Sequence, residues 1–206
     1  MNRPNPDNDS RIVLASGSPR RRELLDRIGV AYEVVPADID ESVIPGEDPA
    51  TYTGRIAAAK VAAVAGRLSR SVIILGADTA VVLGEDMLGK PSGPAEAVEM
   101  LQALSGRAHH VFTAVSVLDC EGSLHSALNV SRVTFADLDA DWITAYVATG
   151  EPLDKAGAYG IQGWAACQIS EVEGSHSAIM GLPLFETARL LARAGLPLPQ
   201  LPRSQP

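Results

Sequence analysis

The sequence has few of the residues that mark several large classes of protein. Only two of its 206 residues are cysteine, Cys120 and Cys167. Two cysteines give neither a disulfide framework nor metal-ligand spacing, and we expect both to be small core residues. No apolar run is long enough to span a membrane, and the polar segment at residues 1–10 lacks the apolar core of a signal peptide. We therefore expect a cytoplasmic protein with no membrane partner.

Positive charge is also in short supply. Seventeen Lys and Arg residues face 25 Asp and Glu residues, which gives a net charge of −8. Broad nucleic-acid binding needs a basic face, so this balance argues against it. A small polyanionic ligand is still compatible with the charge, provided that cations gather locally or a metal bridges the negative groups.

Aromatic residues make up only 4% of the chain, but hydrophobic residues reach 46%, enough for a substantial core. The length is that of one ordinary domain, with room for two lobes. We predict a single domain over residues 11–195, preceded by a disordered segment at residues 1–10. The Pro-rich residues 196–206 are expected to form a tail.

The most informative stretch, residues 11–30, predicts a strand, a tight turn and a helix. Residues 11–16 form a short β-branched apolar run, typical of a buried strand. Ser18 is a good N-cap, Pro19 suits the first helical position, and Gly29 closes the helix.

Three arginines, Arg20, Arg21 and Arg22, occupy the first turn of that helix, where the helix dipole disfavours positive charge. A bound phosphate would explain them, because it would use the free N–H groups, the dipole and the guanidinium groups together. Pairing with nearby Asp or Glu is the alternative, and we favour it for Arg22, which points outward. Arg21 projects towards the core face, where an unpaired charge would be costly.

Strands and helices alternate along the rest of the chain, and one long hairpin interrupts the pattern. This mixture predicts an α/β fold built on a mixed twisted sheet flanked by helices. Helices are predicted over residues 48–65, 92–106, 139–150 and 181–195. Strands are predicted over residues 32–36, 72–75, 81–83, 109–119, 123–135, 165–172 and 177–180.

Polar residues interrupt this pattern where packing does not require them. Asp78 and Thr79 lie between two predicted apolar strands, so Asp78 is a candidate general base, metal ligand or turn former. The cluster around Glu41 can hold a divalent cation or form a solvated acidic loop. Lys60 and Lys90 can each contact phosphate or remain at the surface.

The glycine-rich segment at residues 150–163 has neither a helical nor a strand period, and we expect a surface loop. Asp154, Lys155 and Gln162 are its candidate ligand contacts. Gln162 offers both a donor and an acceptor, which suits the edge of a nucleobase. His109 and His110 lack a third metal ligand and are expected to be strand-end residues.

Seven blocks of this sequence, in this order, resemble the Maf family over residues 11–195. The blocks are SGSPRRRELL, DIDE, GADT, GKP, LSGRAHHVFT, GEPLDKAGAYGIQG and EGSHSAIMGLP. The resemblance implies a nucleoside triphosphate pyrophosphatase that cuts between the α- and β-phosphates with a divalent metal, Mg²⁺ or Mn²⁺. It also implies two lobes around a cleft, a fold similar to that of inosine triphosphate pyrophosphatases, and a homodimer.

The resemblance further assigns roles to individual residues. Asp78 matches the family's proton acceptor, and the AYGIQG block is similar to that of the subgroup acting on dTTP and UTP. The residues implied to bind substrate are Ser18, Arg20, Arg21, Lys60, Thr79, Lys90, Lys155 and Gln162. The residues implied to bind metal are Glu41, Asp78 and Asp154. His176 and Ala80 depart from the residues usual in the family, and we expect them to affect packing more than chemistry.

Two alternative functions are compatible with these motifs. One is the same chemistry on 7-methyl-GTP, although that subgroup has a different sequence at the AYGIQG block. The other is a nucleotide-binding regulator of cell division without turnover, which would keep the arginines but would not need Asp78.

Overall fold

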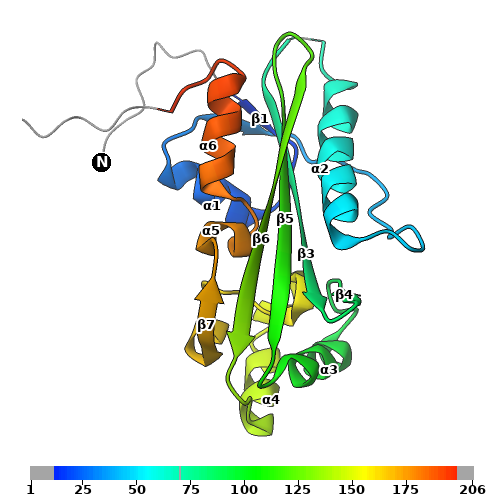
Figure 1. Cartoon of the computed structure of the whole chain (residues 1–206), viewed down its shortest axis with the longest axis vertical. Coiled ribbons are helices and arrows are strands. Elements are labelled where there is room, and N and C mark those ends of the chain that lie inside the picture. The colour runs from blue at the N-terminus through cyan, green and yellow to red at the C-terminus, as the bar shows by residue number, and fades with distance from the viewer. Residues whose placement is uncertain (1–11, 70, 199–206) are drawn as a thin grey trace, which may run out of the picture.

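The computed structural model describes residues 12–69 and 71–198, and within them seven strands form one mixed sheet (Figure 1). The strands are β1 (Ile12–Leu14), β2 (Tyr32–Val34), β3 (Ile74–Leu83), β4 (Asp86–Leu88), β5 (Ala108–Leu118), β6 (Leu124–Phe135) and β7 (Ile169–Glu173). The helices are α1 (Pro19–Arg27), α2 (Pro49–Ala65), α3 (Pro94–Leu104), α4 (Ala140–Ala148), α5 (His176–Met180) and α6 (Leu184–Arg193). Three short 3-10 turns join α4 to β7, namely η1 (Glu151–Asp154), η2 (Ala156–Ala158) and η3 (Trp164–Gln168).

The strand order is β2-β1-β3-β5-β6-β7, with β4 paired to the end of β3. Strand β1 is parallel to β2 and β3, and the other pairs are antiparallel. Figure 1 shows α1, α2 and α6 near one end of the long strands, with α3 and α4 at the other. The predicted α/β fold with a mixed sheet flanked by helices is confirmed.

Strand β3 corrects one of the predictions from sequence. Two strands were expected over residues 72–75 and 81–83, with Asp78 and Thr79 in the connection. The structure has one strand instead, paired with β5 from Ile74↔Leu118 to Val82↔His110. Because β5 supplies backbone partners along this whole length, the polar residues stay extended and Asp78 is not a turn former.

The opposite edge of β3 is only partly covered. Strand β1 pairs there with Ile74 and Leu75, and β4 pairs with residues 81–83. Residues 76–80 therefore have no strand partner on that edge within the described part of the chain. This gap in the sheet lies at the edge of β3 that carries Asp78 and Thr79, whose side chains lie on opposite faces because strand side chains alternate.

Three further expectations were wrong. Residues 177–180 belong to helix α5, because Ser175 caps it through the N–H of Ala178 and Gly181 ends it at a φ of 118°. The 150–163 segment is largely buried rather than a surface loop, because its alanines, Tyr159 and Ile161 join the core. Both cysteines are exposed.

The ends of the described chain bear on the domain prediction. Residues 1–10 lie outside the described residues, as does most of the predicted tail. Leu196 and Leu198, at the start of that tail, pack against the main core. None of the helices in the described ranges combines the length and the apolar character needed to span a membrane.

Candidate active site

A buried ion pair lies at the gap in the sheet. Nζ of Lys60 is 2.7 Å from Oδ1 of Asp78 and 3.1 Å from Oε1 of Glu41. The Lys60 and Asp78 side chains are both buried, whereas that of Glu41 is 47% exposed. The ammonium group therefore joins an interior carboxylate to one at the surface.

Burial raises the pKa of Asp78 above its usual value, and the charges of Lys60 and Arg21 oppose that rise. A carboxylate in an apolar setting loses solvation, which favours its protonated form. A raised pKa makes a carboxylate a better proton acceptor while it remains ionised at neutral pH. Asp78 thus has the environment expected of a general base.

Close packing of α2 on β3 brings this pair together. A Cβ atom on Gly76 would lie 2.8 Å from the carbonyl oxygen of Ala57 and 2.8 Å from Cγ2 of Val61. Only glycine fits this contact, and Lys60 lies on the same buried face of α2. The absence of a side chain at residue 76 therefore sets the Lys60–Asp78 distance.

The N-terminal half of α2 also holds the loop that carries Glu41. The Tyr52 hydroxyl donates to the carbonyl oxygen of Glu41 at 2.9 Å, and Arg55 donates to that of Ser42 at 3.1 Å. Arg55 also forms a two-point ion pair with Glu47, at 2.6 and 2.7 Å. Burial, with the charges of Asp78 and Glu41, raises the pKa of Tyr52 to about 12, so its hydroxyl stays a donor.

The first turn of α1 faces the same region, as the arginines predicted. Arg21 is buried, and it donates to the carbonyl oxygen of Gly181 at 2.8 Å and to Oγ of Ser16 at 2.9 Å. Ser18 is the N-cap residue, but its hydroxyl makes no capping hydrogen bond. Arg22 is exposed and points away from the core.

Arg20 pairs instead with an acidic residue, the alternative that the sequence left open. Its guanidinium is 3.1 Å from Asp154, which also lies 2.7 Å from Nζ of Lys155. Lys155 is buried. Partial burial raises the pKa of the Asp154 carboxyl, but the charges of Lys155 and Arg20 outweigh this effect and lower the pKa overall. Two cations thus share one exposed carboxylate at the mouth of the cleft.

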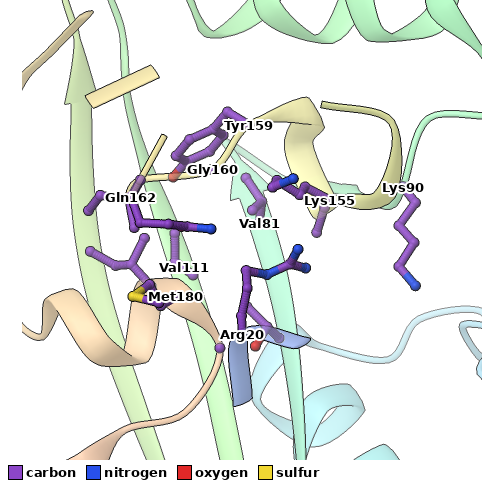
Figure 2. A pocket seen from close by; sticks show the side chains of 14 residues that line it. Arg20, Val81, Lys90, Val111, Lys155, Tyr159, Gly160, Gln162 and Met180 are labelled. Carbon is purple, nitrogen blue, oxygen red and sulfur yellow. The ribbon is translucent and has the colours of Figure 1, made fainter. Parts of the chain in front are cut away.

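The cleft consists of two adjoining cavities that share Arg20 and Lys90 in their walls. One is lined by the α1 turn with Glu41, Lys60 and Asp154. The other lies between α5 and the glycine-rich segment and is lined by residues that include Thr79, Lys155 and Gln162. Figure 2 shows Arg20 rising between Gln162 on one side and Lys90 on the other.

The structure brings the predicted substrate-binding residues to this single cleft. The three predicted metal ligands are not gathered in the same way. Within the described residues, no three His, Cys, Asp or Glu side chains are close enough to hold a metal ion. Glu41 and Asp78 meet at Lys60, while Asp154 is engaged by Arg20 and Lys155.

Sequence reasoning missed several residues of the site. Ser16 and the Gly181 carbonyl hold Arg21, and Tyr159 and Met180 line the second cavity. The Gly181 carbonyl carries no signal in the sequence, because the contact joins residues 160 positions apart. Tyr159 was visible as the one aromatic residue in a glycine-rich segment.

The fold and the site define an α/β protein whose sheet opens onto a cationic cleft with a buried carboxylate, an arrangement suited to a polyphosphate ligand. The chain belongs to the family of Maf-like proteins, whose model matches residues 11–194.

Curated relatives match over almost the whole chain. A protein of Anaeromyxobacter dehalogenans (strain 2CP-1) named dTTP/UTP pyrophosphatase is 53% identical over 195 residues, which cover 92% of this chain and 96% of the relative. A Methylobacillus flagellatus protein with the same name is 50% identical and covers 93% and 96%. The solved Ham1 protein of Staphylococcus aureus is similar over 62% of this chain and 72% of its own, at 17% identity and with a TM-score of 0.43.

Proposed function

We propose that this protein hydrolyses dTTP and UTP to the nucleoside monophosphate and pyrophosphate. Relatives with that name match at about half identity over nearly their full length. The observation that carries the proposal is the buried Asp78, ion-paired to Lys60 at the open edge of the sheet. A protein that only bound nucleotides would need the cations but not this carboxylate.

The reaction follows from the positions of the charged groups. Asp78 accepts a proton from a water molecule whose oxygen bonds to the α-phosphorus. The bond from that phosphorus to the bridging oxygen breaks, and pyrophosphate leaves with the electron pair. Positioning and charge neutralisation supply most of the catalysis in phosphoryl transfer, and Arg20, Arg21 and Lys60 supply positive charge in the wall of one cavity.

We also propose that a divalent cation, Mg²⁺ or Mn²⁺, takes part. Carboxylate oxygens suit either ion, and Glu41 and Asp78 already share one cation, the Lys60 ammonium. These two residues would hold the metal together with phosphate oxygens, and the ion would neutralise charge on the triphosphate. Asp154 would join them only after releasing Arg20 and Lys155.

Selection of the base is assigned to the second cavity. Gln162 is exposed at the tip of a turn, and Thr79 lies on the face of β3 opposite to Asp78. The nucleotide would pass the open edge of β3, with phosphates beside Lys60 and the base beside Gln162. We further propose that the protein works in the cytoplasm as a homodimer.

Product analysis tests the proposal. Purified protein would be given dTTP, UTP, CTP, GTP and 7-methyl-GTP with Mg²⁺ or Mn²⁺, and the products resolved by ³¹P NMR. We expect pyrophosphate and monophosphate from dTTP and UTP, and no release of single phosphate. Preferential cleavage of 7-methyl-GTP would overturn the base assignment, and binding without any turnover would indicate a regulator. Chelation with EDTA should abolish turnover, and added Mn²⁺ or Mg²⁺ should restore it.

A further inference from the structure

Glu151 lies at the start of the glycine-rich segment, and the rest of that segment folds around its carboxylate. Its Oε1 accepts a hydrogen bond from the Tyr146 hydroxyl at 2.9 Å, and its Oε2 accepts one from the N–H of Trp164 at 3.4 Å. The Tyr146 hydroxyl in turn accepts from the N–H of Gly160 at 3.2 Å. Two side chains therefore hold the backbone at residues 160 and 164.

Gln162 lies between these two held positions. The N–H of Gly163 donates to the carbonyl oxygen of Gly160 at 3.0 Å, which closes a tight turn with Gln162 near its tip. The side chain of Gln162 is exposed and directed into the cavity beside Arg20 (Figure 2). The amide group of Gln162 forms no hydrogen bond with another described residue, so its direction depends on the turn.

The glycines of the turn leave room for the side chains of Glu151 and Lys155. A Cβ atom on Gly163 would lie 2.0 Å from Oε1 of Glu151, and one on Gly160 would lie 2.8 Å from Cε of Lys155. Nζ of Lys155 also donates to the carbonyl oxygen of Glu151. The turn is thus packed closely around Glu151, and Lys155, which lines the same cavity as Gln162, is hydrogen-bonded to the same residue.

Tyr146 is well placed to act as the link. It is 3% exposed, and its ring stacks on Trp142 with the centroids 5.0 Å apart. Burial raises the pKa of Tyr146, so the hydroxyl remains protonated and keeps donating to Glu151 at physiological pH. The link is rigid because the ring is packed and its single polar atom is used twice.

We propose that Glu151 and Tyr146 are positioning residues for base selection, which hold the 160–164 turn so that Gln162 faces the pyrimidine edge. The inference rests on the proposed function, because it assigns a role within the same cleft. Neither residue lines the cavities as a ligand contact; both act through the backbone that carries Gln162.

The test compares binding of analogues in which the bond to be cleaved is blocked. Dissociation constants for α,β-methylene-UTP, α,β-methylene-GTP and inorganic pyrophosphate would be measured by calorimetry for wild type and Tyr146→Phe. The matched control is Tyr32→Phe, which removes a tyrosine hydroxyl from β2 at a residue that lines neither cavity. Glu151→Gln is the second variant, because its amide N–H would face the N–H of Trp164.

We expect Tyr146→Phe to weaken binding of the UTP analogue roughly tenfold, the scale of one lost buried hydrogen bond. Binding of pyrophosphate and of the GTP analogue should change less than twofold, and Tyr32→Phe should resemble wild type. Glu151→Gln should reproduce the loss if Tyr146→Phe does not fold. Equal weakening of all three ligands, or no change in either variant, would overturn the inference. Turnover of UTP by wild type is measured separately, so failure of the proposed function is distinguishable.

Discussion

The ammonium nitrogen of Lys60 lies 2.7 Å from Oδ1 of Asp78, and both side chains are buried. A buried carboxylate without a partner would be costly, so Lys60 keeps Asp78 ionised in a place where burial alone would favour its protonation. The pair thus gives the proposed base both a raised pKa and a charged form at neutral pH.

Replacing Lys60 with Met should therefore alter the pH dependence as well as the rate. The active base is the ionised form of Asp78, so activity is lost as pH falls through its pKa. Loss of the Lys60 charge raises that pKa further, and the acid limb of the kcat/KM profile should move to higher pH. We also expect kcat to fall by about 10²–10³-fold, the usual scale for a lost electrostatic contact in the transition state.

Lys90→Met is the matched control for this experiment. Lys90 is exposed at the rim shared by the two cavities and has no ion pair to Asp78. Its loss should raise KM while leaving the acid limb in place. An unchanged limb in Lys60→Met would contradict the role given to the ion pair.

Gly76→Ala tests the packing that sets the Lys60–Asp78 distance. The new methyl group would overlap the Ala57 carbonyl and Val61 at 2.8 Å each, so α2 must move away from β3. We expect a loss of roughly 1–3 kcal/mol in the free energy of unfolding. A tenfold or larger fall in kcat at a temperature where the variant is folded should accompany it. Urea denaturation and steady-state kinetics measure the two effects.

Gly54→Ala provides the control on the same helix. A Cβ atom there would meet nothing within 4 Å, and alanine is the better helix former. This variant should gain up to ~1 kcal/mol and keep full activity. If Gly76→Ala and Gly54→Ala had the same stability and activity, the close approach of α2 to β3 would not explain why residue 76 is glycine.

His109 gives the fold a dependence on pH. Its Nε2 lies 2.7 Å from the Tyr159 hydroxyl, and burial lowers its pKa from 6.5 to about 4. The unfolded chain binds the proton more readily, so the contribution of His109 to stability is complete above pH 6.5 and is lost as pH falls towards 4. The expected loss is about 3 kcal/mol.

Denaturation across that pH range measures this contribution. His109→Gln keeps an uncharged polar group and should flatten the fall in stability. His110→Gln, at the exposed neighbouring position, should retain almost all of it. If stability fell by the same amount in both variants as the pH was lowered, titration of His109 would not be the cause.

Sequence predicted most of the elements and the clustering of the site, for identifiable physical reasons. Helix α2 and the long hairpin have strong periodicity and clear end signals, such as Asp48 before Pro49. The arginines at the start of α1 were evidently out of place unless they had partners, and the structure gives Arg21 the Gly181 carbonyl and Ser16.

The failures occurred where distant residues determine local structure. Strand β3 continues through Gly76 and Asp78 because β5 pairs along its whole length, which no local pattern reveals. Residues 177–180 form a short, mostly apolar run, and the cap from Ser175 and the stop at Gly181 make them part of a helix. The gap between β1 and β4 beside Asp78 depends on strand order, which the sequence alone does not reveal.

The most direct test of the central claim is Asp78→Asn, measured for both binding and turnover of dTTP and UTP. The amide keeps the shape of the side chain and can still accept from Lys60, but it cannot take a proton from water. We predict pyrophosphate release lowered by at least about 10³-fold, with binding of α,β-methylene-UTP within a few-fold of wild type. Pyrophosphate release at more than a tenth of the wild-type rate would contradict the assignment of Asp78 as the base.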